Sequence, residues 1–409
     1  MQSVMSVIQF LSREACMFTT VNRYSLPLCS LLLLTSSVVT ASEWQLSGFI
    51  GQGFVAGEDT QFIVGEDSST FDITEAAFAV SWKPIEHVRF ASALTFRQWG
   101  TLSEADVMFD YLFAEYSHQV GEGMLGIRAG RFKNETGFYS STRDVPFTRP
   151  SIMLPQSIYS DYFRDAQLHI EGGDLFGMHQ VLDGVVDWHI SVGQVNVTED
   201  LDRNVMGSTD FGEFSAEDYY SGDIEFQNDY LRLGVSYYDA EISFDPFIPG
   251  YYYPGDIRLK NWVFSGQFRY ERLELTAEYL KGDRVTNGLV APIEADDLYD
   301  PSVGYYIDLR AYLPNEVELF VRYDKHIDNT DDPDGTNYEA VYGSPAYFGY
   351  TKDWTFGARW FPSNDWLLAV EYHDVEGASW VTPIVSPDPL TQAKHWSLFA
   401  LQLSYRFQW

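Results

Sequence analysis

Cysteine is nearly absent from this chain of 409 residues. Its two cysteines, Cys16 and Cys29, both lie within the first 41 residues. An exported eukaryotic domain of this size usually has disulfides, whereas a bacterial envelope protein does without them. No disulfide can therefore hold residues 42–409 together.

Positive charge is scarce as well. The chain has 26 lysines and arginines against 59 aspartates and glutamates, which gives a formal net charge of −33. Nucleic-acid binding requires a basic surface, so this composition argues against a nucleic-acid partner. An acidic surface is suited to a medium that contains divalent cations.

Long apolar runs and helical periodicity are both missing after residue 41, although 45% of the residues are hydrophobic and 16% are aromatic. A membrane-spanning helix needs about 20 apolar residues in a row. Apolar and polar residues alternate instead, in segments separated by Gly, Pro, Asn and Asp. In lipid, a chain of strands can span only as a closed barrel.

Catalytic and metal-binding motifs are also lacking. The glycines of residues 121–126 match a dinucleotide fingerprint by letter, but they join two expected strands and no helix follows. Residues 330–341 resemble a calcium loop in part, yet Thr330 and Val341 stand where its first and last ligands belong. The histidines are scattered. We therefore expect no enzyme, no metal centre and no cofactor.

Residues 1–41 have the features of a cleaved secretory signal. Basic Arg13 and Arg23 precede an apolar run that begins at residue 31, and small residues end the segment at Ala41. The run is too short for a membrane anchor. Translation could begin at Met1 or at Met17. Residues 42–409 are expected to form one transmembrane barrel domain.

Sixteen strands are expected in that domain, the even number that bacterial barrels have. They are residues 44–56, 70–82, 87–99, 106–118, 124–132, 164–172, 185–195, 219–227, 230–242, 258–270, 273–283, 302–312, 317–326, 351–361, 366–375 and 395–409. Short and long connections alternate, as periplasmic turns and extracellular loops do. The connection 173–184 is an exception, because it is long on the short-turn side.

Several strands have a clean outward row of apolar residues. These rows are Val88, Phe90, Leu94 and Phe96; Trp262, Phe264, Phe268 and Tyr270; and Trp354, Phe356 and Trp360. A slip of one residue would move arginines into lipid at a cost of about 2–4 kcal/mol each near the midplane, so the register is well determined there. The strand 106–118 does not alternate cleanly, and its faces stay undetermined.

The last strand ends on an alternating aromatic row of Tyr405, Phe407 and Trp409. This ending resembles the C-terminal signal of outer-membrane barrel proteins, which the barrel assembly machinery recognises. That signal usually ends in Phe, so Trp409 departs from it. The alternative is an ordinary strand that only closes the barrel.

Residues 130–172 form the most informative connection, "GRFKNETGFYSSTRDVPFTRPSIMLPQSIYSDYFRDAQLHIEG". A loop of this length in a compact unit is usually functional, and Pro146, Pro150 and Pro155 stiffen it. With this loop after the fifth strand, residues 42–409 resemble the porin superfamily. Residues 128–172 look most like the phosphate-selective porins and related anion or dicarboxylate channels, although the chain lacks a long arginine ladder.

The resemblance implies a third loop folded into the lumen and a homotrimer. Charged residues of a pore set its selectivity, and we expect the constriction to contain Arg128, Arg131, Lys133, Arg143, Asp144, Arg149, Asp161, Arg164 and Arg322. Opposing lumen acids are Glu75, Glu278, Asp308, Glu318, Asp324 and Glu371. The alternative is that these charges form salt bridges that brace the wall.

The sequence thus predicts an all-β protein, a sixteen-stranded antiparallel porin of the bacterial outer membrane. It would pass small hydrophilic solutes, with some preference for small anions such as phosphate or carboxylates. Acidic loops such as residues 328–339 would bind Ca²⁺ or Mg²⁺ between themselves and lipopolysaccharide. The alternatives are a cation-preferring general porin, a barrel enzyme of the phospholipase or protease type, and an adhesin or structural barrel with a plugged lumen.

Overall fold

The structure is a computed structural model that describes residues 43–409, except 162–163, 249, 251, 290–297 and 382–390. The expected signal, residues 1–41, lies outside the described residues. No helix among the described residues is both long enough and apolar enough to cross a membrane.

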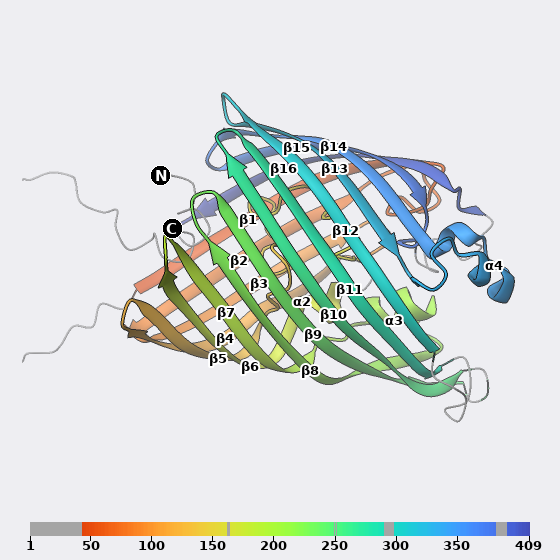
Figure 1. The fold of residues 1–409 in the computed structure, drawn as a ribbon, viewed down its shortest axis with the longest axis horizontal. Helices are drawn as coiled ribbons and strands as arrows, with labels where there is room; N and C mark the ends of the chain where they lie inside the picture. The colour runs from red at the N-terminus through yellow and green to blue at the C-terminus, as the bar shows by residue number, and fades with distance from the viewer. Residues whose placement is uncertain (1–42, 162–163, 249, 251, 290–297, 382–390) are drawn as a thin grey trace, which may run out of the picture.

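Sixteen antiparallel strands close into one barrel (Figure 1), which confirms the predicted fold. They are β1 (Glu43–Glu58), β2 (Ser69–Ile85), β3 (Val88–Trp99), β4 (Asp106–Val120), β5 (Gly123–Lys133), β6 (His169–Val181), β7 (Gly184–Val195), β8 (Gly212–Gln227), β9 (Leu231–Pro246), β10 (Tyr253–Tyr270), β11 (Leu273–Leu289), β12 (Leu298–Leu313), β13 (Val317–Ile327), β14 (Tyr350–Ser363), β15 (Trp366–Gly377) and β16 (His395–Gln408). Each strand pairs with its neighbour in the chain, and β1 pairs with β16 to close the ring.

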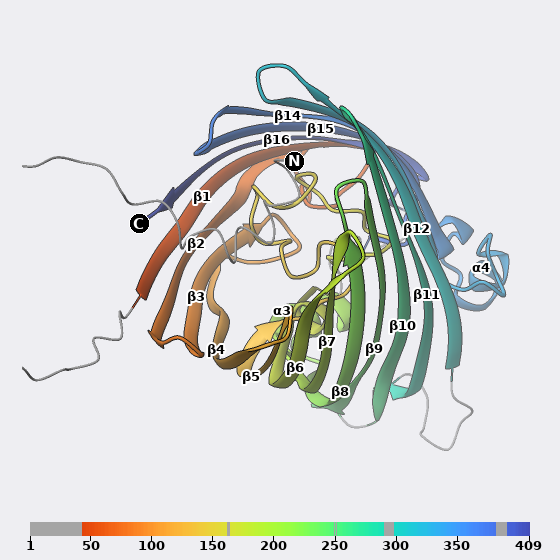
Figure 2. The same cartoon turned by 60° about the vertical axis from the view of Figure 1, so that its left-hand side comes forward.

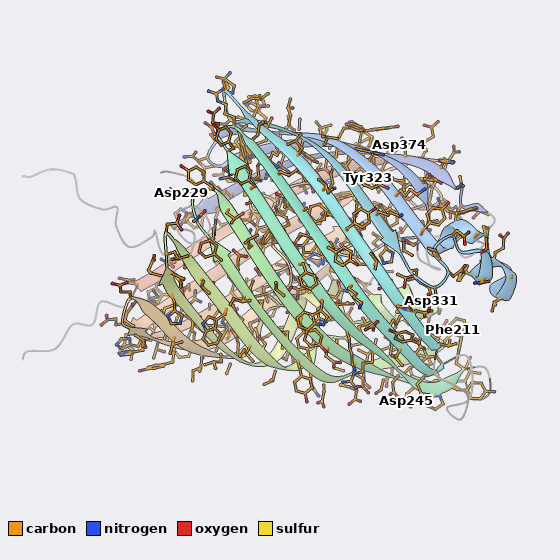
Figure 3. All side chains as sticks on the ribbon, viewed as in Figure 1. Phe211, Asp229, Asp245, Tyr323, Asp331 and Asp374 are labelled. Carbon is orange, nitrogen blue, oxygen red and sulfur yellow. The ribbon has the colours of Figure 1, made fainter. Side chains whose placement is uncertain are left out.

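The two ends of the barrel differ, as the alternation of connections predicts. Asp229 lies in a short turn at one end, whereas Asp245 and Asp331 lie at the end with the long loops (Figure 3). The described loops at that end contain the short helices α2 (Arg164–Leu168), α3 (Glu199–Met206) and α4 (Thr336–Tyr342) and the 3₁₀ turn η2 (Ala346–Gly349).

The sixth strand differs from its prediction. Residues 164–168 form α2, β6 extends from His169 to Val181, and only Leu182 and Asp183 connect it to β7. The exceptional long connection therefore does not exist. Gly172, which the predicted strand includes, and Gly177, which the predicted connection includes, both lie within β6, where a Cβ would meet the Val192 carbonyl at 2.0 Å and the Trp188 ring at 2.7 Å. Close packing against β7 explains these glycines.

The inner and outer faces alternate as predicted along the three clean strands. Phe90, Trp262 and Trp354 are exposed on the outside, whereas the intervening Thr355 and Arg359 are buried. In β4 the register with β3 shifts between Ala93 and Leu94. That bulge breaks the alternation, which is why the sequence left the faces of this strand undetermined.

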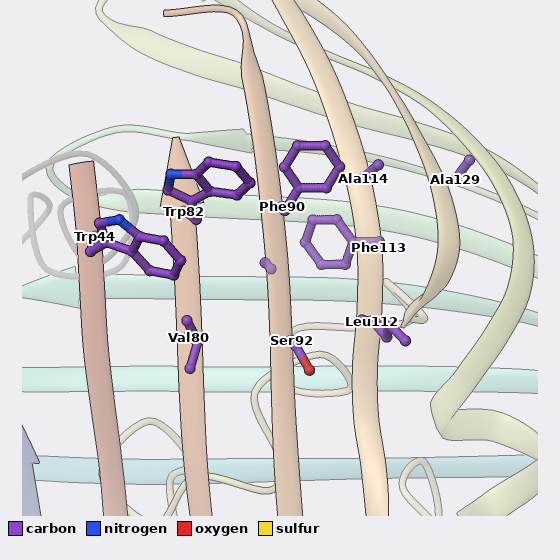
Figure 4. A pocket seen from close by; sticks show the side chains of 10 residues that line it. Trp44, Val80, Trp82, Phe90, Ser92, Leu112, Phe113, Ala114 and Ala129 are labelled. Carbon is purple, nitrogen blue, oxygen red and sulfur yellow. The ribbon is translucent and has the colours of Figure 1, made fainter. Parts of the chain in front are cut away.

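A groove of 370 Å³ lies on the outer face of β1–β5 (Figure 4). Trp44 stacks on Trp82 at 5.2 Å between ring centroids, and Trp82 stacks on Phe90 at 5.5 Å. Ala114 and Ala129 leave space beside these rings. Tryptophan is typical of the interface between a barrel and its membrane.

Inside the barrel, near the long loops, two apolar clusters hold those loops in place. One includes Val55, Ile73, Trp99, Trp380 and Leu398. The other surrounds Leu201 of α3 with side chains from β5–β11. The lumen at this end is therefore partly filled with packed side chains.

Candidate functional site: the lumen and its third loop

The third long loop, residues 134–163, follows β5 and its described part lies inside the barrel (Figure 2). Residues 151–159 are all buried. The loop makes hydrogen bonds to residues of β2, β9, β11 and β13–β16. It therefore crosses the lumen and packs against the opposite wall.

Glu278 of β11 anchors the first part of the loop. Its carboxylate accepts hydrogen bonds from the Phe138 backbone N–H at 2.8 Å and from the Tyr159 hydroxyl at 2.6 Å. Ser265 of β10 and Tyr306 of β12 donate to it at 2.5 and 2.7 Å. Burial raises the pKa of Tyr159 well above its ordinary value, so its phenol stays protonated as a donor. One wall carboxylate thus holds the loop and two neighbouring strands.

An arginine anchors the tip of the loop to the barrel seam. Arg149 donates to both oxygens of Glu75 in β2, at 2.9 and 2.6 Å, and to Gln402 of β16 at 3.0 Å. Both members of the ion pair are only 4% exposed. A bidentate pair of this kind fixes orientation as well as distance.

The backbone after the tip is held by two further wall residues. Glu371 of β15 accepts the backbone N–H groups of Ile152 and Met153. Arg322 of β13 donates to the Ser151 hydroxyl at 2.8 Å and to the Met153 carbonyl at 2.9 Å. These bonds give hydrogen-bond partners to polar groups of the loop that have no access to water. A buried backbone needs such partners to be stable.

The carbonyls of two loop prolines also accept hydrogen bonds from wall arginines. Arg310 of β12 donates to Pro150 at 2.7 Å, and Arg359 of β14 donates to Pro146 at 3.1 Å. Proline fixes the backbone angle φ. The wall and the prolines together therefore define one path for the loop.

Six of the nine predicted constriction residues form one connected cluster inside the barrel. They are Lys133, Arg143, Asp144, Arg149, Asp161 and Arg164. Lys133 and Arg164 both form ion pairs with Asp144, and Arg143 pairs with Asp161 at 3.0 Å. The basic residues of this cluster thus have carboxylate partners.

The other three predicted residues lie apart from this cluster. Arg128 is on the inner wall, 3.5 Å from Glu115 and 3.8 Å from Asp174. Arg322 contacts the loop from β13. Arg131 stands opposite the exposed Leu112 and forms an ion pair with Glu171, whose side chain is 59% exposed, so it lies on the outer face.

Sequence reasoning did not assign some wall residues that contact the loop or its charges. Arg97 and Arg359 alternate with the outward rows of their strands, so the period places them inside, but it does not reveal their contacts with Asp161 and Pro146 of the loop. The alternation of Leu309 with Arg310 could have identified Arg310 as inward-facing. Asp110, which pairs with Lys133, is the extra residue at the register shift between β3 and β4, so no simple period reveals it.

The wall formed by β7 and β8 keeps exposed acids. The side chains of Asp187 and Glu225 are 41% and 23% exposed. Asp223 lies beside them and has Glu135, near the start of the loop, as an electrostatic neighbour. Arg232 of β9 pairs with Glu225 at 2.6 Å and sits over the Phe138 ring at 4.1 Å. Carboxylates outnumber basic groups on this side of the lumen.

Comparison with known proteins shows likeness of structure but not of sequence. No family model and no curated protein matches the chain. OmpT of Vibrio cholerae in its trimer form is 9% identical, with 90% of this chain and 100% of that chain covered and a TM-score of 0.54. The outer-membrane channel DcaP of Acinetobacter baumannii is 10% identical, with coverages of 92% and 100% and a TM-score of 0.54. An anion-selective porin from Comamonas acidovorans is 11% identical, with coverages of 90% and 100% and a TM-score of 0.51.

At these identities the likeness is one of fold. The closed ring of strands has an apolar outer face and a polar, charged inner face, which is the arrangement that a membrane-spanning barrel requires. The protein is therefore a closed sixteen-stranded barrel with the fold of the porins.

Proposed function

We propose that the protein is a passive channel for small hydrophilic solutes. The observation that carries this proposal is the closed barrel whose inner wall is polar and whose third loop is held across the lumen at both ends. Such a loop narrows a pore without chemistry. The channel DcaP and the anion-selective porin, which share this fold, support the same function.

The direct test is electrical. The purified protein should give stepwise conductance in a planar lipid bilayer and should admit small sugars into liposomes. A closed, non-conducting barrel would favour a structural role. Hydrolysis of lipid or peptide by the same preparation would favour an enzyme.

For selectivity, the geometry favours the cation-preferring alternative. The expected anion preference depends on Arg128, Arg143, Arg149 and Arg164. The last three are buried against carboxylates, and Arg128 lies within 4 Å of Glu115 and Asp174. The acids of β7 and β8 remain partly exposed to the lumen. We therefore propose weak cation preference. Transport of phosphate or carboxylates, and membership of the phosphate-selective group, stay predictions from the sequence resemblance.

A catalytic alternative would need a pair of Ser and His, or of Asp and His, that faces outward or lies on a loop, whereas the candidate residues here lie on the inner wall. Asp174 is 3.1 Å from His189 and 3.0 Å from Ser191. The serine thus donates to the carboxylate, whereas a catalytic serine would donate to the imidazole. This arrangement braces the wall of β6 and β7, and we propose no chemical step for it.

We propose a homotrimer that associates through the β1–β5 side. On the outer face of β1, the exposed Gln52 accepts a hydrogen bond from Thr74 of β2 at 2.9 Å. A polar pair on an outer face suits contact with a protein better than contact with lipid, and OmpT has been solved as a trimer. Light scattering in neutral detergent should give three chains for the parent and a smaller assembly for Gln52→Leu, if the pair lies in the interface.

The C-terminal row remains a proposed assembly signal for the barrel assembly machinery. Trp409 exchanges backbone hydrogen bonds with Leu46 at 2.8 and 3.0 Å, so it also helps to close the barrel. Deletion of residues 407–409 should abolish membrane insertion, while Trp409→Phe should insert normally. Normal insertion of the truncated chain would contradict the proposal.

Binding of Ca²⁺ or Mg²⁺ by the loops also remains a proposal. Asp332 accepts the Asn337 and Tyr338 backbone N–H groups of α4 at 3.0 and 2.7 Å, and Asp328 pairs with Arg284 at 3.1 Å. No group of three or more potential ligands is assembled within the described residues. A cation here would need lipopolysaccharide phosphates as additional ligands, so EDTA should lower thermal stability only when lipopolysaccharide is present.

A further inference from the structure

Two of the scattered histidines come together at the short-turn end of the barrel. His87 lies in the turn between β2 and β3, and His118 lies near the end of β4. Their spacing in the sequence matches no metal-binding motif, but β3 and β4 pair antiparallel and return the chain to the same level. The centroids of the two imidazole rings are 4.9 Å apart, and the ring planes are inclined at 57°.

This separation is the one expected for two imidazoles bound to a single metal ion. A zinc ion lies about 2.0–2.1 Å from a histidine nitrogen, which places it about 3.2 Å from the ring centroid. Zinc ligands are arranged tetrahedrally, so the centroids of two bound imidazoles are about 5 Å apart. Binding by His87 and His118 would therefore require rotation of the rings at most, and no movement of the backbone.

The backbone of Ser117 holds the His87 ring in the form that can bind a metal ion. The Ser117 backbone N–H donates to the His87 carbonyl at 2.9 Å, and Nδ1 of His87 lies 3.1 Å from the Ser117 carbonyl oxygen. A carbonyl oxygen only accepts hydrogen bonds, so the proton of the neutral ring is on Nδ1 and Nε2 has a free lone pair. Metal-binding histidines are commonly oriented by such a carbonyl.

The charges around the two histidines favour a cation. Glu86 and Glu122 are exposed in the turns on either side. The basic residues beside the first turn, Lys83 and Arg89, each have a glutamate opposite them on the neighbouring strand. A divalent ion that approaches this end therefore meets more uncompensated negative charge than positive charge.

The ligand set selects the class of metal. His118 is exposed and His87 is half-buried, so water reaches both rings. No third histidine, cysteine or carboxylate completes a metal-binding group with them in the described part of the chain. Imidazole suits Zn²⁺, Cu²⁺ and Ni²⁺, whereas Ca²⁺ and Mg²⁺ prefer oxygen ligands. The site therefore differs in chemistry from any cation site in the acidic loops at the other end.

We propose that His87 and His118 form a two-histidine site for a divalent transition metal ion such as Zn²⁺, with water completing the coordination. The bound ion would tie the turn between β2 and β3 to β4. Tyr116, whose ring is 6.1 Å from His87, is exposed on the outer face. The site thus lies on the outer rim of the barrel, and it does not depend on channel activity.

The test uses the untagged protein in neutral detergent, with Zn²⁺ as the probe and isothermal titration calorimetry as the measurement. An excess of Mg²⁺ occupies the carboxylates. The variants His87→Gln and His118→Gln each remove one imidazole. The matched control His395→Gln removes an exposed histidine at the start of β16, near the long loops. Light scattering gives the assembly state, because the rim borders the proposed trimer side, and a heat-dependent shift in SDS gels verifies folding.

The parent and the control should bind one Zn²⁺ per chain at this site. Each variant should bind it at least tenfold more weakly, since the loss of even an outer partner of a metal ligand costs about 10–100-fold. Equal binding by either variant and the parent, or no binding by the parent in the presence of Mg²⁺, would overturn the proposal.

A second probe separates coordination from effects on folding. One equivalent of Cu²⁺ should give the parent an electron paramagnetic resonance spectrum with coupling to two imidazole nitrogens, and each folded variant a spectrum with coupling to one. Coupling to fewer than two imidazole nitrogens in the parent would also overturn the proposal. Because both measurements report binding, their failure is distinguishable from a failure of the channel proposal.

Discussion

The two walls of the lumen use the same kinds of charged residue in different ways. On the wall of β11–β16 and β2, side chains such as Glu278, Glu371 and Arg322 are buried and bonded to the third loop. On the wall of β7 and β8, Asp187 and Glu225 stay partly exposed. Charge on the first wall holds the loop, and charge on the second is available to solutes.

The difference shows that facing inward is not enough to make a residue part of a pore. The low-dielectric wall strengthens the field of charges that line a narrow water path. Charges that are buried against a loop and paired with carboxylates contribute little to that field. Position relative to the loop therefore decides which inward charges act on solutes.

Removal of the third loop should have the largest effect, because it would abolish the difference between the two walls. Replacing residues 138–159 with a short Gly-Ser linker should raise single-channel conductance several-fold, because the segment crosses the lumen. Shortening residues 331–343, which lie in an extracellular loop, is the control and should leave conductance unchanged. Equal conductance in the parent and the loop-deleted protein would show that the loop does not narrow the pore.

The next effect concerns stability on the loop-bearing wall. Arg149→Ala leaves Glu75 buried without its ion-pair partner, and should lower the free energy of unfolding by about 3–5 kcal/mol. The double variant Arg149→Ala with Glu75→Ala should recover part of the lost free energy of unfolding, because no unpaired carboxylate stays buried. Unfolding in urea from lipid vesicles measures both values. A single variant as stable as the parent would mean that this pair does not anchor the loop.

Selectivity should respond most to the opposite wall. Asp223→Asn with Glu225→Gln removes two acids there and releases Arg232 from its partner, so the reversal potential in a KCl gradient should move toward anions. The matched control is Glu217→Gln with Asp218→Asn, which removes two exposed acids of the same strand at its extracellular end. Identical shifts in the two variants would contradict a local effect of the wall.

The smallest effect is expected from the arginines that the sequence favoured. Arg143→Gln with Arg164→Gln should shift the reversal potential less than the β8 variant does, because both guanidinium groups are buried. The sequence alone predicts the opposite order, with these arginines dominant. A larger shift in the arginine variant would restore the anion-selective interpretation.

The sequence predicted the barrel because alternation is local. In a clean strand, a few residues distinguish the outer face from the inner face, as Trp354 and Phe356 alternate with Thr355. The glycine-rich β6 and the bulged β4 were the exceptions, since close packing and a register shift depend on neighbouring strands. The partners of the loop were beyond such reasoning. Arg149 meets Gln402 across 253 positions of sequence, and no period indicates that contact.

The reversal potential of the unmodified protein in a planar bilayer under a KCl gradient tests the central claim most directly. If the exposed acids of β7 and β8 set the field while the loop arginines are neutralised, the potential should have the sign of cation preference. A potential with the sign of anion preference would show that the loop arginines act on solutes despite their burial, and would contradict the account.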